Sequence, residues 1–212
     1  VYQIPEAGRT AKGKAIVNLL NLDSEEKITN ILPVKEFSEG LYLLMVTSNG
    51  IIKKTALNAY SNPRAGGIIA ITLDEDNNLI DVKLTDGNQD IVLSTKNGLS
   101  IRFKEKEVRE IGRAGKGVKG INLKKVDQVV STETILNEDI ALLTVTEKGF
   151  GKRTPISDYP IQGRGGKGVI TIKTTERNGK VIGIAQISDE DEVMMVTAEG
   201  KIIRVKVKGI PI

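Results

Sequence analysis

The stretch TSNGIIKKT, residues 47–55, contains a short pattern that recurs three more times in this chain. The matching stretches are TKNGLSIRF (95–103), TEKGFGKRT (146–154) and TAEGKIIRV (197–205). Their threonines are separated by steps of 48, 51 and 51 residues, and each copy has a glycine three residues after the threonine. A cation lies four residues after each glycine. A period of about 50 residues indicates a repeat protein whose units stack on one another.

A second motif, a glycine-rich loop with cations, recurs with the same period. Its copies are RTAKG (9–13), RAGG (64–67), RAGKG (113–117) and RGGKG (164–168), of which the second is degenerate because it lacks the lysine. Each loop precedes a run that we expect to be a strand, at 15–20, 68–73, 118–123 and 169–174. Two more apolar runs follow in each unit. They lie at 128–136 and 139–146 in the third unit and at 181–187 and 192–197 in the fourth.

Each unit therefore holds a few short strands, and the last two are joined by a tight turn. The turn dipeptides are Asn49-Gly50, Asn97-Gly98, Lys148-Gly149 and Glu199-Gly200, in which glycine tolerates a positive φ. No segment keeps a helical apolar period, and we interpret the best helical candidate, 103–112, as a strand exit. Four-stranded units of this length are typical of a β-propeller or a related ring. The sequence predicts one all-β repeat domain over 1–212, with approximate repeats 1–60, 61–111, 112–160 and 161–212.

The composition excludes several classes of protein. The chain has no cysteine and no histidine, which removes disulfides, Cys-His and Ser-His pairs, and most transition-metal sites. It has no tryptophan and only 3% aromatic residues, so base-stacking platforms for single strands are not expected. Because there is no signal-peptide pattern and no apolar run of about 18 residues, we expect a cytoplasmic protein without a membrane partner. The formal net charge of +4 is only mildly basic, so the distribution of charge matters more.

The loop IQGRGGKGVITI (161–172) raises the question of a nucleotide site. Gly163, Gly165 and Gly168 satisfy the G-x-G-x-x-G spacing of dinucleotide-binding folds. That motif needs a helix N-terminus after the loop to receive the pyrophosphate, whereas a strand is predicted here. The Gly-Lys-Ser/Thr ending of a P-loop is also absent. We therefore expect no cofactor.

The four glycine-rich loops indicate a surface that binds nucleic acid. Stacked repeats would place them at equivalent points of one rim, as a spaced line of positive charge. Duplex DNA carries one negative charge per about 1.7 Å of its axis, and lysine and arginine contacts gain by releasing counterions. Glycine lets the loop backbone approach phosphates and expose amide donors to them. The candidate loop contacts are Arg9, Lys12, Lys14, Arg64, Arg113, Lys116, Lys119, Arg164, Gly165, Gly166 and Lys167.

The cations of the Thr-x-x-Gly repeat form a second candidate row, one strand beyond each turn. Its members are Lys53, Lys54, Arg102, Lys152, Arg153 and Arg204. Charged residues on an outer strand protect a sheet edge, and on the outside of a ring they can also contact DNA. Two acidic clusters, 74–78 and 188–193, lack the ligand spacing of an EF-hand calcium loop. We expect these clusters to be solvated loops on the faces of the ring, away from DNA.

Longer stretches of the chain resemble the C-terminal domain of DNA gyrase A. They are VYQIPEAGRTAKGKAIVNLL (1–20), ILPVKEF (31–37), GFGKRTPISDYP (149–160) and TTERNGKVIG (174–183). The resemblance implies a β-pinwheel, a propeller-like ring usually of about six blades, of which this chain would be a fragment. It implies a non-catalytic domain of a type II topoisomerase that wraps double-stranded DNA around its rim to support negative supercoiling. The implied partners are the rest of gyrase A, and gyrase B, in a bacterial cytoplasm at the nucleoid.

The family's heptapeptide, the gyrase box, reads Gln-Arg-Arg-Gly-Gly-Lys-Gly. The box-like motif of this chain resembles it at six of seven positions and comprises Gln162, Gly163, Arg164, Gly165, Gly166, Lys167 and Gly168. Gly163 stands where the first arginine of the box would be. In the family the box usually precedes the stretch that resembles 1–20. The resemblance therefore leaves open whether the true box lies upstream of Val1.

Other functions compete with DNA wrapping. The C-terminal domain of topoisomerase IV is similar, and this fragment does not separate the two. A protein-interaction propeller of the WD40 type would carry Trp-Asp and Gly-His signatures, which this chain lacks. A propeller enzyme needs metals or converging acid-base groups, and the carboxylates here are scattered. Tyr2, Tyr42, Tyr60 and Tyr159 are interpreted as packing residues, because nothing around them resembles the DNA-cleaving tyrosine of type II topoisomerases.

Overall fold

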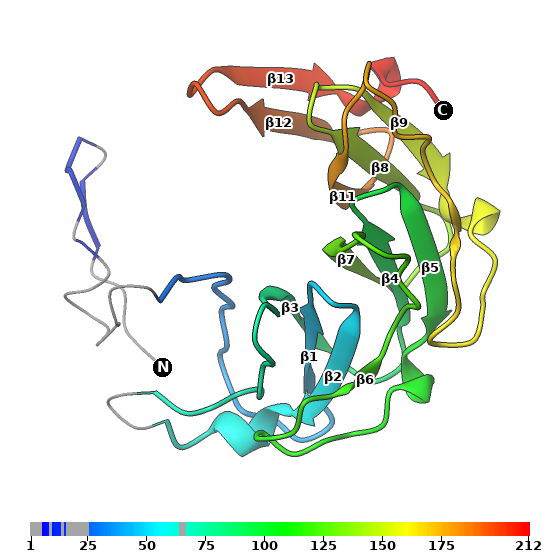
Figure 1. Ribbon diagram of the computed structural model, residues 1–212. Coiled ribbons are helices and arrows are strands. Elements are labelled where there is room, and N and C mark those ends of the chain that lie inside the picture. The colour runs from blue at the N-terminus through cyan, green and yellow to red at the C-terminus, as the bar shows by residue number, and fades with distance from the viewer. Residues whose placement is uncertain (1–5, 9, 14, 16–25, 64–66) are drawn as a thin grey trace.

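The computed structural model describes residues 6–8, 10–13, 15, 26–63 and 67–212. Figure 1 shows four antiparallel sheets following one another along an arc. The first sheet has the order β3 (Leu79–Thr85), β1 (Tyr42–Thr47), β2 (Ile51–Ala56), β6 (Val118–Lys119). The second has the order β7 (Val129–Ile135), β4 (Asp90–Thr95), β5 (Leu99–Lys104), β10 (Val169–Ile170). The third comprises β11 (Val181–Ile187), β8 (Ala141–Thr146) and β9 (Gly151–Pro155), and the fourth comprises β12 (Glu192–Val196) and β13 (Ile202–Lys206).

Each sheet, or blade, takes its strands from successive repeats. In the first blade, one repeat supplies the β1–β2 hairpin, the next supplies β3, and the one after that supplies β6. The second blade repeats this scheme with β4–β5, β7 and β10. The chain therefore ties each blade to its neighbours by crossing between them. The predicted all-β fold of propeller-like blades is confirmed, and the strand exchange is that of the expected β-pinwheel.

The strands predicted after the glycine-rich loops are much shorter than expected. The run 118–123 contributes only β6, the run 169–174 contributes only β10, and 68–73 contains no strand. The run 15–20 lies almost entirely outside the described residues. The reason is the exchange of strands, since the chain leaves the outer edge of one blade after two residues to reach the next blade. By contrast, the runs 128–136, 139–146, 181–187 and 192–197 form β7, β8, β11 and β12 as predicted.

The Thr-x-x-Gly motif closes each hairpin. Its glycines have positive φ at all four positions: +75° at Gly50, +86° at Gly98, +77° at Gly149 and +79° at Gly200. In three of the copies the threonine hydroxyl accepts from the amide four residues later, as in Ile51 N to Thr47 Oγ1 at 3.3 Å, whereas Thr146 Oγ1 donates to the Phe150 carbonyl at 3.1 Å. A side chain on Gly98 is excluded as well, since its Cβ would lie 2.1 Å from the carbonyl oxygen of Ile172. The turn therefore explains why this motif recurs.

The core lies between the blades. Leu44, Val46 and Ile52 of the first blade pack in one fully buried cluster with Ile91, Leu93, Ile101 and Phe103 of the second. Because neighbouring blades cover both faces of the central strands, 91–93 is a continuous apolar run and not an alternating one. Each fully buried aliphatic side chain stabilises the fold by about 1.5–3 kcal/mol. The outer edges of β2 and β5 pair with β6 and β10 and form isolated bridges with Glu110 and Ile161.

Short 3-10 helices lie along the convex side of the arc in Figure 1: η2 (Leu57–Tyr60), η3 (Glu105–Glu107), η4 (Ile156–Asp158) and η5 (Val207–Gly209). The segment 103–112, interpreted as a strand exit, contains the end of β5 followed by η3. Each 3-10 helix follows the outer strand of a hairpin and leads toward a glycine-rich loop or the end of the chain. These helices and loops form the convex surface, which we call the rim.

Candidate nucleic-acid interface

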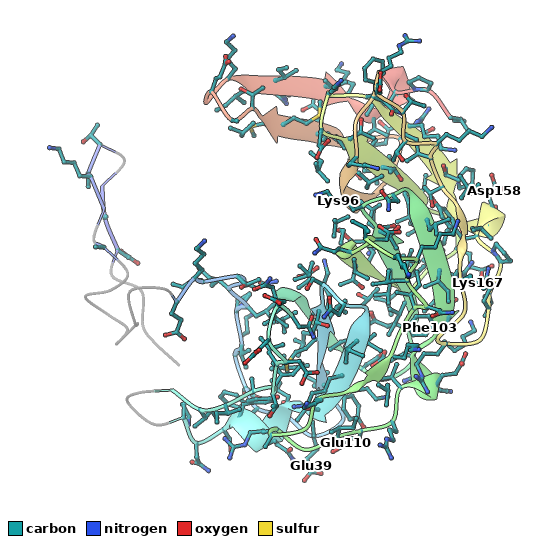
Figure 2. All side chains as sticks on the ribbon, viewed as in Figure 1. Glu39, Lys96, Phe103, Glu110, Asp158 and Lys167 are labelled. Carbon is teal, nitrogen blue, oxygen red and sulfur yellow. The ribbon has the colours of Figure 1, made fainter. Side chains whose placement is uncertain are left out.

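Two of the glycine-rich loops lie on the rim, at the outer edges of neighbouring blades. Loops 112–117 and 163–168 lead directly into β6 and β10, the outermost strands of the first two blades. The amide of Gly165 donates to the carbonyl of Gly120, and the amide of Asn122 donates to the carbonyl of Gly166, both at 2.8 Å. Figure 2 shows Lys167 on the convex side and Lys96 on the concave side. These bonds join loop 163–168 to the segment that follows β6, so loop 112–117 and loop 163–168 are linked through β6.

Loop 112–117 has its carbonyl groups held by donors from the protein. The Ile111 carbonyl accepts from Thr55 Oγ1 at 2.7 Å, and the Ala114 carbonyl accepts from Thr72 Oγ1 at 2.6 Å. The Arg113 carbonyl accepts from Lys53 Nζ. The Gly115 carbonyl accepts from the Thr72 amide at 3.4 Å. In a planar trans peptide the N–H points opposite to the C=O of the preceding residue, so the amides of Ala114 and Lys116 point away from the donors on the Arg113 and Gly115 carbonyls. Neither amide has an acceptor among the described residues, which leaves two donors for an anion.

The cations of the rim differ in their exposure and in their ion pairs. Lys12, Arg113, Lys119 and Lys167 are exposed, and their side chains make no ion pair within the described part of the chain. Lys116 is exposed and pairs with Asp74. Exposed ion pairs contribute about 0–1 kcal/mol, so an approaching phosphate can displace this one. Lys152 is half-buried, and Arg9, Lys14 and Arg64 lie outside the described residues.

The contact with Asp74 corrects one expectation about the acidic clusters. We expected 74–78 to lie away from the basic loops, but Thr72 is hydrogen-bonded to loop 112–117 and brings Asp74 beside it. The second cluster behaves similarly, because Asp189 pairs with Arg153. Acidic loops therefore neutralise some of the predicted cations.

Arg164 of the box-like motif is engaged by the protein. Its backbone amide donates to Glu107 Oε2 at 2.8 Å, its Nε donates to the Glu107 carbonyl at 3.1 Å, and its Nη1 donates to the Lys119 carbonyl at 2.5 Å. The Glu107 carboxylate thus already accepts from the Arg164 amide, which is one of the loop amides that we expected to face a phosphate. Lys167 is the exposed cation of the motif.

The glycines of the box-like motif are required by backbone conformation and close packing. Gly165 and Gly168 have φ of +81° and +75°. A Cβ on Gly168 would lie 2.5 Å from the Ser100 carbonyl oxygen, and one on Gly166 would lie 3.2 Å from Ile101 Cδ1. Gln162 is half-buried, and its amide donates to the Arg102 carbonyl at 2.8 Å. The motif therefore seats β10 against the second blade in addition to presenting Lys167.

Two candidates of the second row, Lys54 and Arg102, are buried. Lys54 and Arg102 are 8% and 4% exposed, so a DNA phosphate cannot reach their charged groups. Arg102 Nη2 pairs with Asp90 at 2.7 Å and with Glu138 at 2.6 Å, while its Nη1 donates to the Ile156 carbonyl at 3.1 Å. Arg102 is therefore a structural residue.

Of the cations four residues after the repeat glycines, two more behave like Arg102 and one does not. Lys54 Nζ donates to the Glu105 carbonyl at 3.5 Å, and Arg153 Nε donates to the Ile210 carbonyl at 2.8 Å. Like Arg102, each reaches the 3-10 helix, or the residue after it, of the next blade along the arc. Arg204 differs, because it is exposed and pairs with Glu192 across its own hairpin. The repeated cation is thus an inter-blade clamp, which a one-dimensional pattern cannot distinguish from a surface charge.

Sequence reasoning missed two kinds of residue. Lys106 and Arg109 are exposed cations between β5 and loop 112–117, and their signal was the charged stretch 103–112. Lys53 was grouped with Lys54 but is fully buried, and its ammonium group donates to two carbonyl groups. Burial, reinforced by the charge of Arg113, lowers the pKa of Lys53 from 10.5 to about 8.

An arc of stacked blades that exchange strands, with cationic glycine-rich loops on its rim, defines a β-propeller domain of the pinwheel type. The chain matches the family described as "DNA gyrase C-terminal domain, beta-propeller" over residues 1–35, 41–86, 89–135, 141–188 and 191–212. It belongs to that family.

Individual relatives agree with this assignment. The DNA gyrase A protein of Salmonella typhimurium (strain LT2) is 48% identical over 212 residues, which are all of this chain and 24% of that protein. The solved C-terminal domain of DNA topoisomerase IV is 32% identical with a TM-score of 0.87, covering 93% of this chain and 62% of that one. The solved DNA gyrase A C-terminal domain is 27% identical with a TM-score of 0.84, covering 93% and 66%. This chain therefore spans about a quarter of the curated relative.

No helix in the described part of the chain is long and apolar enough to cross a membrane.

Proposed function

We propose that this chain is a non-catalytic module of a bacterial DNA gyrase that binds duplex DNA along its rim and bends it. The observation that carries the proposal is the line of exposed cations on the convex side, in loop 112–117, in β6 and in loop 163–168. These exposed cations and the outward amides of loop 112–117 fit a phosphate backbone. We expect binding that is largely independent of sequence. In the whole enzyme its partners would be the rest of gyrase A, and gyrase B, in the cytoplasm at the nucleoid.

The set of residues that we propose to contact DNA is smaller than the set predicted from the sequence alone. They include the exposed cations Lys12, Arg113, Lys116, Lys119 and Lys167 and the sequence candidates Arg9, Lys14 and Arg64. Lys54 and Arg102 are left out because they are buried, and Arg153 is left out because its guanidinium group is already engaged. Arg164 acts by fixing its loop.

The curvature of the rim supports bending in addition to binding. Smoothly bending a DNA segment of about 20–30 bp by about 40–90° costs about 1–6 kcal/mol. Each contact along a convex surface offsets part of this bending free energy, so each loop stabilises the bend of the DNA that it contacts. Losing one loop should release the bend locally while the remaining loops keep the DNA bound.

The experiment that tests the proposal is the salt dependence of affinity for random-sequence duplex, measured by fluorescence anisotropy. With about five phosphates neutralised, log K should fall against log salt with a slope of about −4 to −5. Lys119→Ala combined with Lys167→Ala should reduce the magnitude of the slope by about 2. Lys201→Ala is the matched control, because Lys201 is exposed in the β12–β13 turn and pairs with Glu199. A flat salt response, or an equal effect of the control, would refute the proposal.

A role in topoisomerase IV is the second candidate, because the solved C-terminal domain of that enzyme has a TM-score of 0.87 with this chain. The test is the full-length protein that carries this chain, combined with its ATPase partner, relaxed plasmid and ATP. Negative supercoils in the product would support gyrase. Relaxation or decatenation without supercoiling would support topoisomerase IV.

A further inference from the structure

Lys53 is a buried cation with no carboxylate beside it. The residue is 0% exposed, and Nζ donates to the Ala70 carbonyl at 2.5 Å and to the Arg113 carbonyl. It makes no ion pair with any described carboxylate. Burying an ammonium group costs free energy unless hydrogen bonds compensate for the lost hydration. A charged Lys53 therefore costs more free energy at this position than an apolar side chain.

The second unit shows that a blade can hold an aliphatic side chain at this position. Six residues after the repeated threonine, the first and third units have Lys53 and Lys152, whereas the second has Ile101, which is 0% exposed like Lys53. Ile101 lies beneath loop 163–168, where a Cβ on Gly166 would come within 3.2 Å of its Cδ1. Lys53 occupies the corresponding place beneath loop 112–117. An aliphatic side chain therefore fills this site between strand and loop, and the lysine adds only its two charged hydrogen bonds.

Those two bonds join the segments that form the rim at this point. Ala70 belongs to the segment that follows the Arg64 loop, and Arg113 belongs to loop 112–117. Thr72 adds a bond from the same segment to the Ala114 carbonyl at 2.6 Å. With the Arg113 carbonyl drawn toward Lys53, the next amide and the Arg113 side chain are left on the outer side of the loop.

We propose that Lys53, although DNA cannot touch it, is a positioning residue of the DNA-binding rim that holds loop 112–117 in its phosphate-accepting conformation. This inference rests on the proposed function. Because Lys53 is buried, its effect on DNA affinity must act through the conformation of loop 112–117.

The surroundings of Lys53 make this effect dependent on pH. The charged and titratable groups that face it in the described structure are Arg113 and, through the shared Ala70 carbonyl, Tyr60 at 3.3 Å. Arginine stays protonated, and burial raises the pKa of Tyr60 above its ordinary 10.0. Because the chain has no histidine and no cysteine, no other ordinary side chain titrates between about pH 7 and pH 9.

Lys53 is protonated below about pH 8 and neutral above it. A neutral amine donates weaker hydrogen bonds than an ammonium group and adds no positive charge near the rim. DNA affinity should therefore decline as the pH rises through about 8.

The test uses the whole chain and random-sequence duplex at constant ionic strength, with Kd measured at about pH 7 and about pH 9, on either side of the Lys53 transition. The wild type should lose about three- to tenfold in affinity between these values. Lys53→Met, and Lys53→Ile which copies Ile101, should bind weakly at both, with a ratio near one. Lys106→Met removes an exposed rim charge and should keep the wild-type ratio. Circular dichroism at each pH checks the fold.

The outcomes separate the two proposals. Duplex binding by the wild type at the lower pH supports the proposed function whatever Lys53 does, and its absence refutes that function. A wild-type affinity that does not change with pH, or a pH dependence retained in Lys53→Met, would overturn the role of Lys53. Unfolding of both Lys53 variants would overturn it as well, because the lysine would then support the blade itself.

Discussion

Replacing Arg102 by methionine tests whether the repeated cation is an inter-blade clamp. The change removes the partner of Asp90, which is only 5% exposed, and takes donors from the carbonyls of Ile156 and Tyr159. Methionine keeps much of the packing volume, so the loss is chiefly electrostatic. The matched control is Arg204→Met at the equivalent position, where the arginine is exposed and has one partner, Glu192.

The magnitude follows from what each variant leaves behind. Removing one member of a buried pair typically costs about 3–5 kcal/mol, because the other charge stays buried without compensation. Asp90 keeps its second contact, with Lys104 at 2.7 Å, and Glu138 is mostly exposed and gains water. We therefore expect Arg102→Met to lower the free energy of unfolding by about 3 kcal/mol, at the lower end of that range. Arg204→Met should cost about 0–1 kcal/mol.

Urea unfolding followed by circular dichroism measures both values. Below the unfolding transition, Arg102→Met should also bind duplex DNA with the wild-type salt slope, since Arg102 does not reach the surface. A loss below about 1 kcal/mol, or equal losses in the two variants, would refute the clamp. A smaller salt slope for a folded Arg102→Met protein would show that Arg102 contributes to the DNA interface.

Three further predictions concern the turn, the box-like motif and the buried lysine. Gly149→Ala should cost about 1–2 kcal/mol in the free energy of unfolding, since its φ is +77° but no atom lies within 4 Å of the added Cβ. Gly98→Ala should cost clearly more in the same assay, because its Cβ would lie 2.1 Å from the Ile172 carbonyl oxygen; equal costs would contradict this packing. Glu107→Gln should raise DNA affinity about two- to threefold in an anisotropy titration by removing the anion at the Arg164 amide, and weaker binding would contradict this. Wild-type stability in urea should rise between about pH 8 and pH 10.5, because the unfolded chain keeps the Lys53 proton that the folded chain has released, and the rise should be smaller in Lys53→Met.

The fold could be predicted from the sequence because its main constraints are local. The Thr-x-x-Gly turn needs a positive φ at Gly50 and its equivalents, and the pattern shows this directly. The assignment of each strand to a blade could not be predicted from the sequence. The short strand β6 pairs with β2 across an interval of more than 60 residues, and the ladder consists of two residue pairs. Such a ladder leaves almost no periodicity, so a whole apolar run was predicted to be a strand.

The sequence showed which residues of the candidate site are cations, but it did not show which of these cations are exposed and which are buried. Arg113, Lys119 and Lys167 are exposed cations on the rim, as their loops indicated. Lys53, Lys54 and Arg102 carry the same charge in the same repeated motif, yet all three are buried. The next blade covers Lys54 and Arg102, whereas the segment around Ala70 and loop 112–117 cover Lys53. The burial of a long cation depends on the next repeat in space, which a pattern within one repeat does not contain.

The most direct test of DNA bending by the rim is ligation of nicked plasmid on the protein, read as the distribution of topoisomers. The wild-type chain should shift the distribution away from that of plasmid ligated alone, because DNA held along a curved rim traps writhe. Lys119→Ala with Lys167→Ala should remove most of that shift while affinity stays within about tenfold, or about 1.4 kcal/mol. If the wild type binds the plasmid and leaves the distribution unchanged, the chain binds DNA without wrapping it, and the central claim is wrong.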